Sequence, residues 1–234
     1  MATFVLVHGA WHGSWCWKRV RQALQAQGHN VFTPTLTGVG ERSHLSSPLV
    51  TLDTHIDDVV NLIRWEELSN VVLCGHSYAG CVISGVADRI PERIARLIYL
   101  DAFVLEDGES LHAALPPAQR DLQLELTKQY GDGWKVPPIP AEVFGVNATD
   151  RDWVDRQCTL QSLATFQQPV RLTRGTAVIP TTYILATGWT ESPFAKFSER
   201  ARDKGWTMLS VACGHDVMLD LPDELTRILL DAAS

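Results

Sequence analysis

Short apolar runs alternate with amphipathic stretches along the whole chain. The apolar runs predict buried strands at residues 4–7, 31–32, 71–74, 97–100, 182–185 and 208–211. Between them, apolar residues recur at helical spacing, which predicts helices at residues 17–27, 52–65, 78–89, 194–204 and 222–232. The last of these begins well, because Pro222 suits a first helical turn. Strands that alternate with helices predict an α/β fold with a mostly parallel sheet flanked by helices.

One segment, residues 103–180, breaks this alternation. It contains no clear strand, but it carries several prolines and the scattered aromatic residues Tyr130, Trp134, Phe144, Trp153 and Phe166. We interpret it as a small, mainly helical lid inserted between late strands of a core made of residues 1–102 and 181–234. The alternative is a long surface loop with one or two helices.

Composition and charge narrow the class of protein. A chain of 234 residues fits one α/β domain, and its 45% hydrophobic and 20% charged residues exclude a disordered chain. Lysine and arginine total 20 against 27 acidic residues, a formal charge of −7, and no basic block relieves that acidity. We therefore expect no nucleic-acid partner and no membrane partner. The N-terminus lacks the features of a signal peptide, so we expect a cytoplasmic location.

The cysteines do not predict a disulfide framework or a metal site. There are five of them, an odd number, and none forms a Cys-x-x-Cys pair. We expect buried, reduced thiols. No cluster resembles a set of metal ligands, so we expect neither a metal nor a cofactor.

The strongest chemical signal lies where the strand at residues 71–74 meets the next helix. Residues 71–80 read VVLCGHSYAG, which places Ser77 in a Gly-x-Ser-x-Ala-Gly pattern. A nucleophile on so tight a turn needs small neighbours, and Gly75 and Ala79 provide them, although Ala79 replaces the second glycine of the usual pattern. We predict that Ser77 is the nucleophile, whereas His76 packs within the turn. The alternative is a tight turn that contains a serine by chance.

Two further segments supply the groups that such a serine needs. Residues 8–11 (HGAW) close the first strand, where the Ala10 N–H could join the Tyr78 N–H as an oxyanion hole. Of the eight histidines, His215 alone follows a late strand in the order serine, acid, histidine, so we predict that it is the base. His112 is the weaker candidate, and four other histidines are expected to be surface or packing residues: His12, His29, His44 and His55.

These motifs resemble the α/β-hydrolase superfamily. The stretches HGAWHGSWCW at 8–17, GHSYAG at 75–80 and Gly214-His215 are similar to the branch that contains plant methyl-ester esterases, hydroxynitrile lyases and bacterial relatives. In the lyases of that branch a threonine occupies the position of Gly9 and a lysine the position of Asp216. The resemblance therefore implies an esterase rather than a lyase, with Gly9 in contact with substrate. Trp11, together with the aromatic residues of segment 103–180, suggests an apolar or aromatic substrate, so we expect Trp11 to bind it as well.

The acid that would orient His215 departs from the family pattern. Trp189 stands where the resemblance would place an aspartate. Asp101 ends the apolar strand at residues 97–100, and a carboxylate there is costly without a partner. Haloalkane dehalogenases resemble this arrangement, so we predict that Asp101 is the acid. Glu191 is the second candidate, and a simple turn cap is the alternative role for Asp101.

The sequence thus predicts a serine carboxylesterase with a Ser77–His215–Asp101 triad, acting on a small apolar or aromatic ester. Two other functions stay open. One is a lyase or cofactor-free oxygenase that uses the histidine–acid pair for proton transfer, and the other is a ligand-binding receptor without turnover. The expected partner is a small-molecule ester, and a homodimer is allowed by the sequence.

Overall fold

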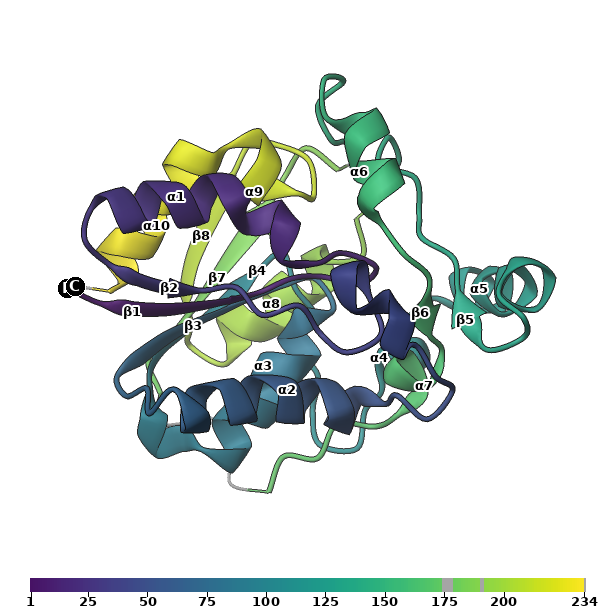
Figure 1. Cartoon of the computed structure of the whole chain (residues 1–234), viewed down its shortest axis with the longest axis horizontal. Coiled ribbons are helices and arrows are strands. Elements are labelled where there is room, and N and C mark those ends of the chain that lie inside the picture. The colour runs from purple at the N-terminus through teal and green to yellow at the C-terminus, as the bar shows by residue number, and fades with distance from the viewer. Residues whose placement is uncertain (174–178, 190–191, 234) are drawn as a thin grey trace.

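The computed structural model describes residues 1–173, 179–189 and 192–233. At its centre is a six-stranded sheet in the order β2-β1-β3-β4-β7-β8, and every neighbouring pair in it is parallel (Figure 1). The strands are β1 (Thr3–Val7), β2 (Asn30–Phe32), β3 (Val71–His76), β4 (Ile94–Leu100), β7 (Thr181–Ala186) and β8 (Thr207–Val211). All six predicted strands are present, which confirms the predicted mostly parallel sheet.

Helices cover both faces of this sheet. Helices α1 (Lys18–Ala26) and α10 (Pro222–Ala232) lie on one face, and α2 (Leu52–Trp65) and α3 (Ala79–Arg89) lie on the other (Figure 1). Helix α8 (Ala195–Asp203) packs on β7 and β8. The remaining helices of the core are short: η1 (Ser14–Trp17), η2 (Gly40–Leu45), η3 (Pro91–Arg93) and α9 (Val217–Asp220).

Local sequence explains where the main helices begin. Helix α2 starts at a capping box, in which Thr51 and Thr54 satisfy each other's backbone N–H groups. Helix α10 has Pro222 in its first turn, as predicted. The first helix differs slightly from its prediction, because its start is a 3-10 turn and the α-helix begins at Lys18.

The strand order fixes where a site can form. Strand β1 lies between β2 and β3, so the chain runs outward to one side of β1 and later returns to the other. Ligand sites of parallel α/β sheets collect at the carboxyl ends of strands next to such a reversal. Val7 is opposite Gly75 in the register of β1 and β3. The residues that follow these two strands are therefore neighbours.

Residues 103–180 form a separate set of short elements. They contain α4 (Leu111–Ala114), α5 (Pro117–Tyr130), α6 (Arg151–Gln157), α7 (Ala164–Gln167) and an antiparallel pair, β5 (Lys135–Val136) with β6 (Gln161–Ser162). In Figure 1 these elements lie beyond the carboxyl ends of the sheet strands, and α5 with β5 extends farthest from the sheet. Helices make up most of the regular structure of this segment, because its two strands have only two residues each.

The core is built from the apolar residues of the strands and of the inner faces of the helices. The five cysteines are free, and Cys16, Cys74 and Cys81 are buried in this core. In the part of the chain that the structure describes, no helix is both long enough and apolar enough to cross a membrane.

Candidate active site

Ser77 stands on a strained turn between β3 and α3. Its φ is 56°, in the left-handed region that residues with a side chain seldom adopt. The turn is held by backbone hydrogen bonds: Ser77 N–H donates to the Leu100 carbonyl at 3.1 Å, and the Ser77 carbonyl accepts from Phe103 N–H at 3.1 Å. Ser77 is half-buried whereas His76 and Tyr78 are buried, so this turn presents the serine to the outside.

Small residues make this turn sterically feasible. A Cβ on Gly75 would lie 2.7 Å from the Ala79 carbonyl oxygen, and one on Gly80 would lie 2.1 Å from the Phe103 carbonyl oxygen. The sequence identified Gly75 and Ala79 as the necessary small neighbours. Gly80 was missed, because its need arises from Phe103 of the segment after β4, which is distant in sequence.

The loop after β1 lies directly against this turn. A Cβ on Gly9 would come within 3.0 Å of Ser77 Cβ and 2.9 Å of His76 Nδ1. Among the hydrogen bonds of the described residues, none uses the backbone N–H of Ala10 or of Tyr78. Two N–H donors without a protein acceptor therefore lie near Ser77, one in the loop after β1 and one in the turn after β3.

Trp11 fixes the far end of this loop. Its φ is 65°, its backbone N–H donates to Gln161 Oε1 at 2.9 Å, and its indole Nε1–H donates to the Val136 carbonyl at 3.0 Å. The side chain is only 6% exposed. Trp11 therefore forms a wall between the loop after β1 and the short β5–β6 sheet.

His215 and Asp101 are in contact at the same edge of the sheet. His215 Nδ1 is 2.6 Å from Asp101 Oδ2, and both side chains are buried. Asp101 follows β4, whereas His215 lies in the loop between β8 and α9. The other carboxylate oxygen of Asp101 accepts the Ala186 N–H at 3.1 Å. Burial raises the pKa of Asp101, although its hydrogen bond to His215 opposes that shift.

Aromatic rings enclose His215. The Phe194 ring stacks on the imidazole, with centroids 4.9 Å apart and planes 10° apart. The rings of Phe144 and Trp189 lie at 5.1 and 5.2 Å. Trp189, at the position where the family resemblance would place an aspartate, thus packs against the histidine. These rings limit the rotation of the imidazole and exclude water from its sides.

His215 is also tied to the turn that carries Ser77. His76 Nε2 is 3.0 Å from the His215 carbonyl oxygen, and the two rings are 4.4 Å apart. Within the described residues, the Ser77 hydroxyl itself makes no hydrogen bond. Catalytic hydrogen bonds are often long in unliganded enzymes and shorten when substrate binds.

The other candidates from the sequence fall elsewhere. His112 lies on α4 beside Arg120 and Asp121 of α5. Glu191 lies outside the described residues. Of the scattered aromatic residues named for segment 103–180, Phe144 and Phe166 contact Trp11, whereas Tyr130 is 62% exposed.

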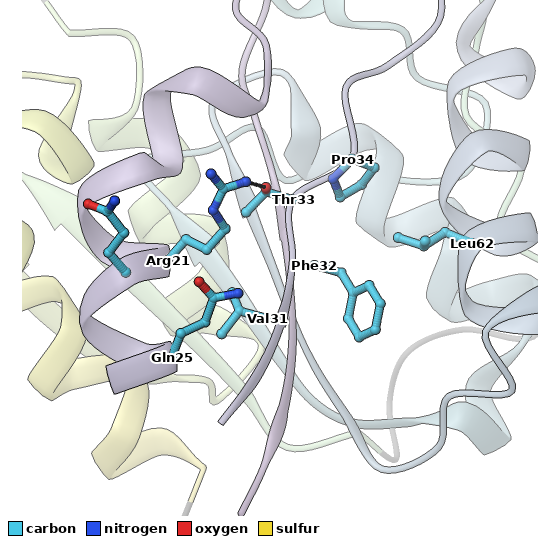
Figure 2. A pocket seen from close by; sticks show the side chains of 8 residues that line it. Arg21, Gln25, Val31, Phe32, Thr33, Pro34 and Leu62 are labelled. Atoms are coloured by element: carbon cyan, nitrogen blue, oxygen red, sulfur yellow. Dashed lines mark hydrogen bonds between the residues drawn. The ribbon is translucent and has the colours of Figure 1, made fainter. Parts of the chain in front are cut away.

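A surface cavity of about 580 Å³ lies away from these groups. It is bounded by α1, by the edge strand β2 and by Leu62 of α2, and Arg21 donates to Thr33 Oγ1 at its side (Figure 2). None of the candidate catalytic residues lines it, so it is not the active site. No group of three His, Cys, Asp or Glu side chains suited to a metal ion occurs within the described ranges.

Comparison with known proteins agrees with this architecture. The model of the alpha/beta hydrolase family matches residues 4–228. A carbendazim hydrolyzing esterase of Nocardioides sp. (strain SG-4G) is 52% identical over an alignment of 241 positions that covers 98% of each chain. The putative chloroplastic methylesterase 14 of Arabidopsis thaliana is 32% identical over 140 residues, which cover 58% of this chain and 40% of that protein.

Solved structures share the fold at lower identity. An extracellular alpha/beta-hydrolase from a Paenibacillus species, with homology to tobacco salicylic acid binding protein 2, superposes with a TM-score of 0.86 at 22% identity over 99% of both chains. The pyrethroid hydrolase PytH superposes with a TM-score of 0.77 at 23% identity over 99% of this chain and 97% of the other. The chain therefore belongs to the alpha/beta hydrolase family, and it is an enzyme of the esterase type.

Proposed function

We propose that this esterase acts through a covalent acyl-enzyme formed on Ser77. His215 is the general base, Asp101 orients it, and the backbone N–H groups of Ala10 and Tyr78 bind the oxyanion. The observation that carries the proposal is the 2.6 Å contact between Asp101 and His215, buried at the sheet edge at which Ser77 stands in its left-handed turn.

The proposed reaction has two halves. Ser77 Oγ attacks the acyl carbon and forms an ester bond, while its proton passes to His215 Nε2 and then leaves with the alcohol. A water molecule next attacks the acyl-enzyme, gives its proton to His215 and releases the acid. Asp101 accepts the Nδ1–H of His215, which leaves the Nε2 lone pair directed toward the serine. Its charge also stabilises the imidazolium that forms in each half.

Two backbone N–H donors would stabilise the negative charge that develops during the proposed reaction. The tetrahedral intermediate carries a negative oxygen, and Ala10 and Tyr78 have no competing protein acceptor for their N–H groups among the described residues. Losing one such donor in a serine hydrolase costs about 10²–10³-fold in rate. Their fixed placement means that little reorganisation is needed as the charge develops.

The surroundings favour an apolar or aromatic ester. Trp11, Phe144, Trp189 and Phe194 form a connected group of rings around the candidate base. The Nocardioides relative is named for the hydrolysis of carbendazim, which is an aromatic methyl carbamate. We infer that aromatic methyl carbamates and aromatic esters are the substrate class, with residues 103–180 as the lid over the core of residues 1–102 and 181–234.

Lyase chemistry is less well supported. A lyase of this fold would use a cation beside the base to stabilise the leaving anion. The residue after His215 is Asp216, a fully buried acid whose carboxylate is 3.2 Å from His12. Burial opposes ionisation of Asp216, but His12 more than offsets that cost and holds its pKa below the usual range. This position thus carries a negative charge.

An active-site label tests the covalent mechanism. We expect diethyl p-nitrophenyl phosphate to release one equivalent of p-nitrophenol and to leave a diethylphosphoryl group on Ser77, identified by peptide mass spectrometry. Protection by carbendazim would link the labelled serine to the proposed substrate class. Labelling of another residue, or inhibition without a covalent adduct, would contradict the mechanism; heat-denatured protein serves as the control.

Gly9 offers a second test, because it decides how much room lies above Ser77. A threonine Cβ there would lie 2.9 Å from His76 Nδ1, closer than real Cβ atoms approach, and 3.0 Å from Ser77 Cβ, which is a tight contact. We expect Gly9→Thr to lower kcat/KM for p-nitrophenyl acetate by about 10-fold or more, because the added atoms would displace Ser77 or His76 from their positions. Gly9→Ala should lose less. Equal activity of all three proteins would show that this space is not used.

A further inference from the structure

A second buried histidine–aspartate pair lies beside the first. His12 and Asp216 are 2% and 0% exposed, and His12 Nε2 is 3.2 Å from Asp216 Oδ2. The other ring nitrogen, His12 Nδ1, is 2.7 Å from the carbonyl oxygen of Ala10. The proposed reaction does not use this pair directly, although it touches a residue of the proposed oxyanion hole.

The partners of His12 define its ionisation state. A carboxylate and a carbonyl oxygen both accept hydrogen bonds, so both ring nitrogens of His12 must donate. A neutral imidazole has a single N–H, and only the imidazolium has two. Burial opposes this charge, but Cys158 and Asp216 more than offset it, so the pKa of His12 is held well above its usual range. The pair is therefore an ion pair at neutral pH.

The titratable groups around the pair come from several elements. Cys158 Sγ is 3.9 Å from His12 Nδ1, and the Trp15 ring stacks on His12 at 4.9 Å. His76, at the end of β3, lies 3.8 Å from Asp216 Oδ1, and burial keeps its own pKa well below the usual range. The other ionisable groups that interact electrostatically with His12 or Asp216 are His8, Cys16, Asp101, Cys213 and His215.

A further buried histidine holds the preceding peptide of the same loop. His8 Nδ1 is 2.8 Å from the Gly9 carbonyl oxygen, and His8 Nε2 accepts the Leu36 N–H at 3.0 Å. This ring therefore donates through one nitrogen only and is neutral, in line with burial, which lowers the pKa of His8 to about 3. The peptide that bears the Ala10 N–H is thus held by His8, and the next peptide is held by His12.

Asp216 connects this arrangement to the base. It is the residue directly after His215, in the loop between β8 and α9, whereas Ala10 lies in the loop after β1. The contacts from the Ala10 carbonyl to His12 and from His12 to Asp216 therefore connect the two loops. The two residues of the ion pair are 204 positions apart in the sequence. The distance between the oxyanion donor and the base depends on these contacts.

We propose that the His12–Asp216 ion pair is a positioning device that locks the oxyanion-hole loop to the loop of the catalytic base. The pair touches neither substrate nor the reacting atoms, and it acts through the Ala10 peptide and the backbone next to His215. This proposal rests on the proposed function, because it assumes that Ala10 and His215 act in the same reaction.

The variant Asp216→Asn removes the charge and keeps the shape. An asparagine can donate to His12 Nε2 while His12 Nδ1–H still donates to Ala10, so the fold is retained with a neutral histidine. We expect kcat for p-nitrophenyl acetate to fall about 10–100-fold, below the full loss of an oxyanion donor, with KM within about twofold. His12→Gln, which can satisfy one partner at most, should give a similar fall. The double variant should be little worse than either single one.

A tetrahedral inhibitor separates positioning from general damage. We expect the affinity for a phenylboronic acid, whose adduct on Ser77 occupies the oxyanion hole, to weaken in proportion to kcat, while the affinity for a planar aromatic acid stays within about twofold. Asp150→Asn is the matched control, because Asp150 is also a buried acid in an ion pair, with Arg19 at 2.7 Å, and it bonds neither the Ala10 peptide nor His215. That control should lower Tm and leave kcat and boronate affinity unchanged.

Nitrogen-15 spectra of the histidine rings test the ion pair without any turnover. In the wild type at pH 7.5, both ring nitrogens of His12 should be protonated, and in Asp216→Asn one should not. A wild-type His12 with one bare ring nitrogen, or variants with wild-type kcat and boronate affinity, would overturn the proposal. Retained activity in Ser77→Ala would instead overturn the proposed function. The protonation of His12, measured by the nitrogen-15 spectra, does not depend on that result.

Discussion

Replacing Ser77 with alanine is expected to lower kcat for a p-nitrophenyl ester by about 10⁶-fold, the loss seen when a serine hydrolase loses its nucleophile. The change removes one oxygen atom from a half-buried side chain. The rest of the proposed machinery stays in place: the Asp101–His215 pair and the free N–H groups of Ala10 and Tyr78. Residual activity of about 10³–10⁴ over water would come from these groups and from substrate binding.

A matched serine on the next helix controls for the loss of a hydroxyl. Ser84 is buried in α3, where its hydroxyl donates to the Gly80 carbonyl and is 2.8 Å from the Tyr99 hydroxyl. Ser84→Ala should cost about 1 kcal/mol of stability and leave kcat near the wild-type value. If Ser77→Ala kept more than about 1% of the activity, no acyl-enzyme on Ser77 could be obligatory. Proton transfer by the His215–Asp101 pair would then be the leading mechanism.

The fold was predictable because its signals are local. Apolar runs and helical spacing lie within single elements, so all six sheet strands and the main helices could be located before the structure was known. The strand pair β5–β6 could not, because it has two residues on each side and is defined only by its pairing across a long loop. Its partners, Val136 and Gln161, also hold Trp11, which ties this small sheet to the site.

The candidate site was predictable only in part, because some of its features depend on contacts between residues that are far apart in the sequence. The turn around Ser77 is contained in one short stretch, and the position of Asp101 followed from a carboxylate at the end of an apolar strand. The roles of His12 and Asp216 could not be found in this way. His12 was expected to be a surface or packing residue, yet it is buried in an ion pair with a residue 204 positions away. The feature that identifies this pair is that both charged side chains are buried, and burial cannot be read from the sequence.

Asp101→Asn is expected to lower kcat by about 10⁴-fold while the protein stays fully folded. The asparagine oxygen can still accept the Ala186 N–H, which is 3.1 Å from Asp101 Oδ1. Its amide nitrogen would face His215 Nδ1 and donate to it. That bond would fix the imidazole in the tautomer that carries its proton on Nε2, and this tautomer cannot accept the proton of Ser77. The loss should therefore appear in kcat, measured with p-nitrophenyl acetate, with little change in KM.

The stability of the same variant separates a catalytic acid from a structural cap. Burial raises the pKa of Asp101, so the folded state binds the proton of this group more tightly than the unfolded state does. The contribution of Asp101 to stability is therefore complete below its unfolded pKa, about 3.9, and is lost as pH rises through the raised folded value. At neutral pH the buried carboxylate is a cost, and Asp101→Asn should match or exceed the wild-type Tm. A turn cap would behave in the opposite way, with a lower Tm and wild-type kcat. Glu191→Gln is the companion variant, since a 10⁴-fold loss there, with Asp101→Asn active, would transfer the role of the acid to Glu191.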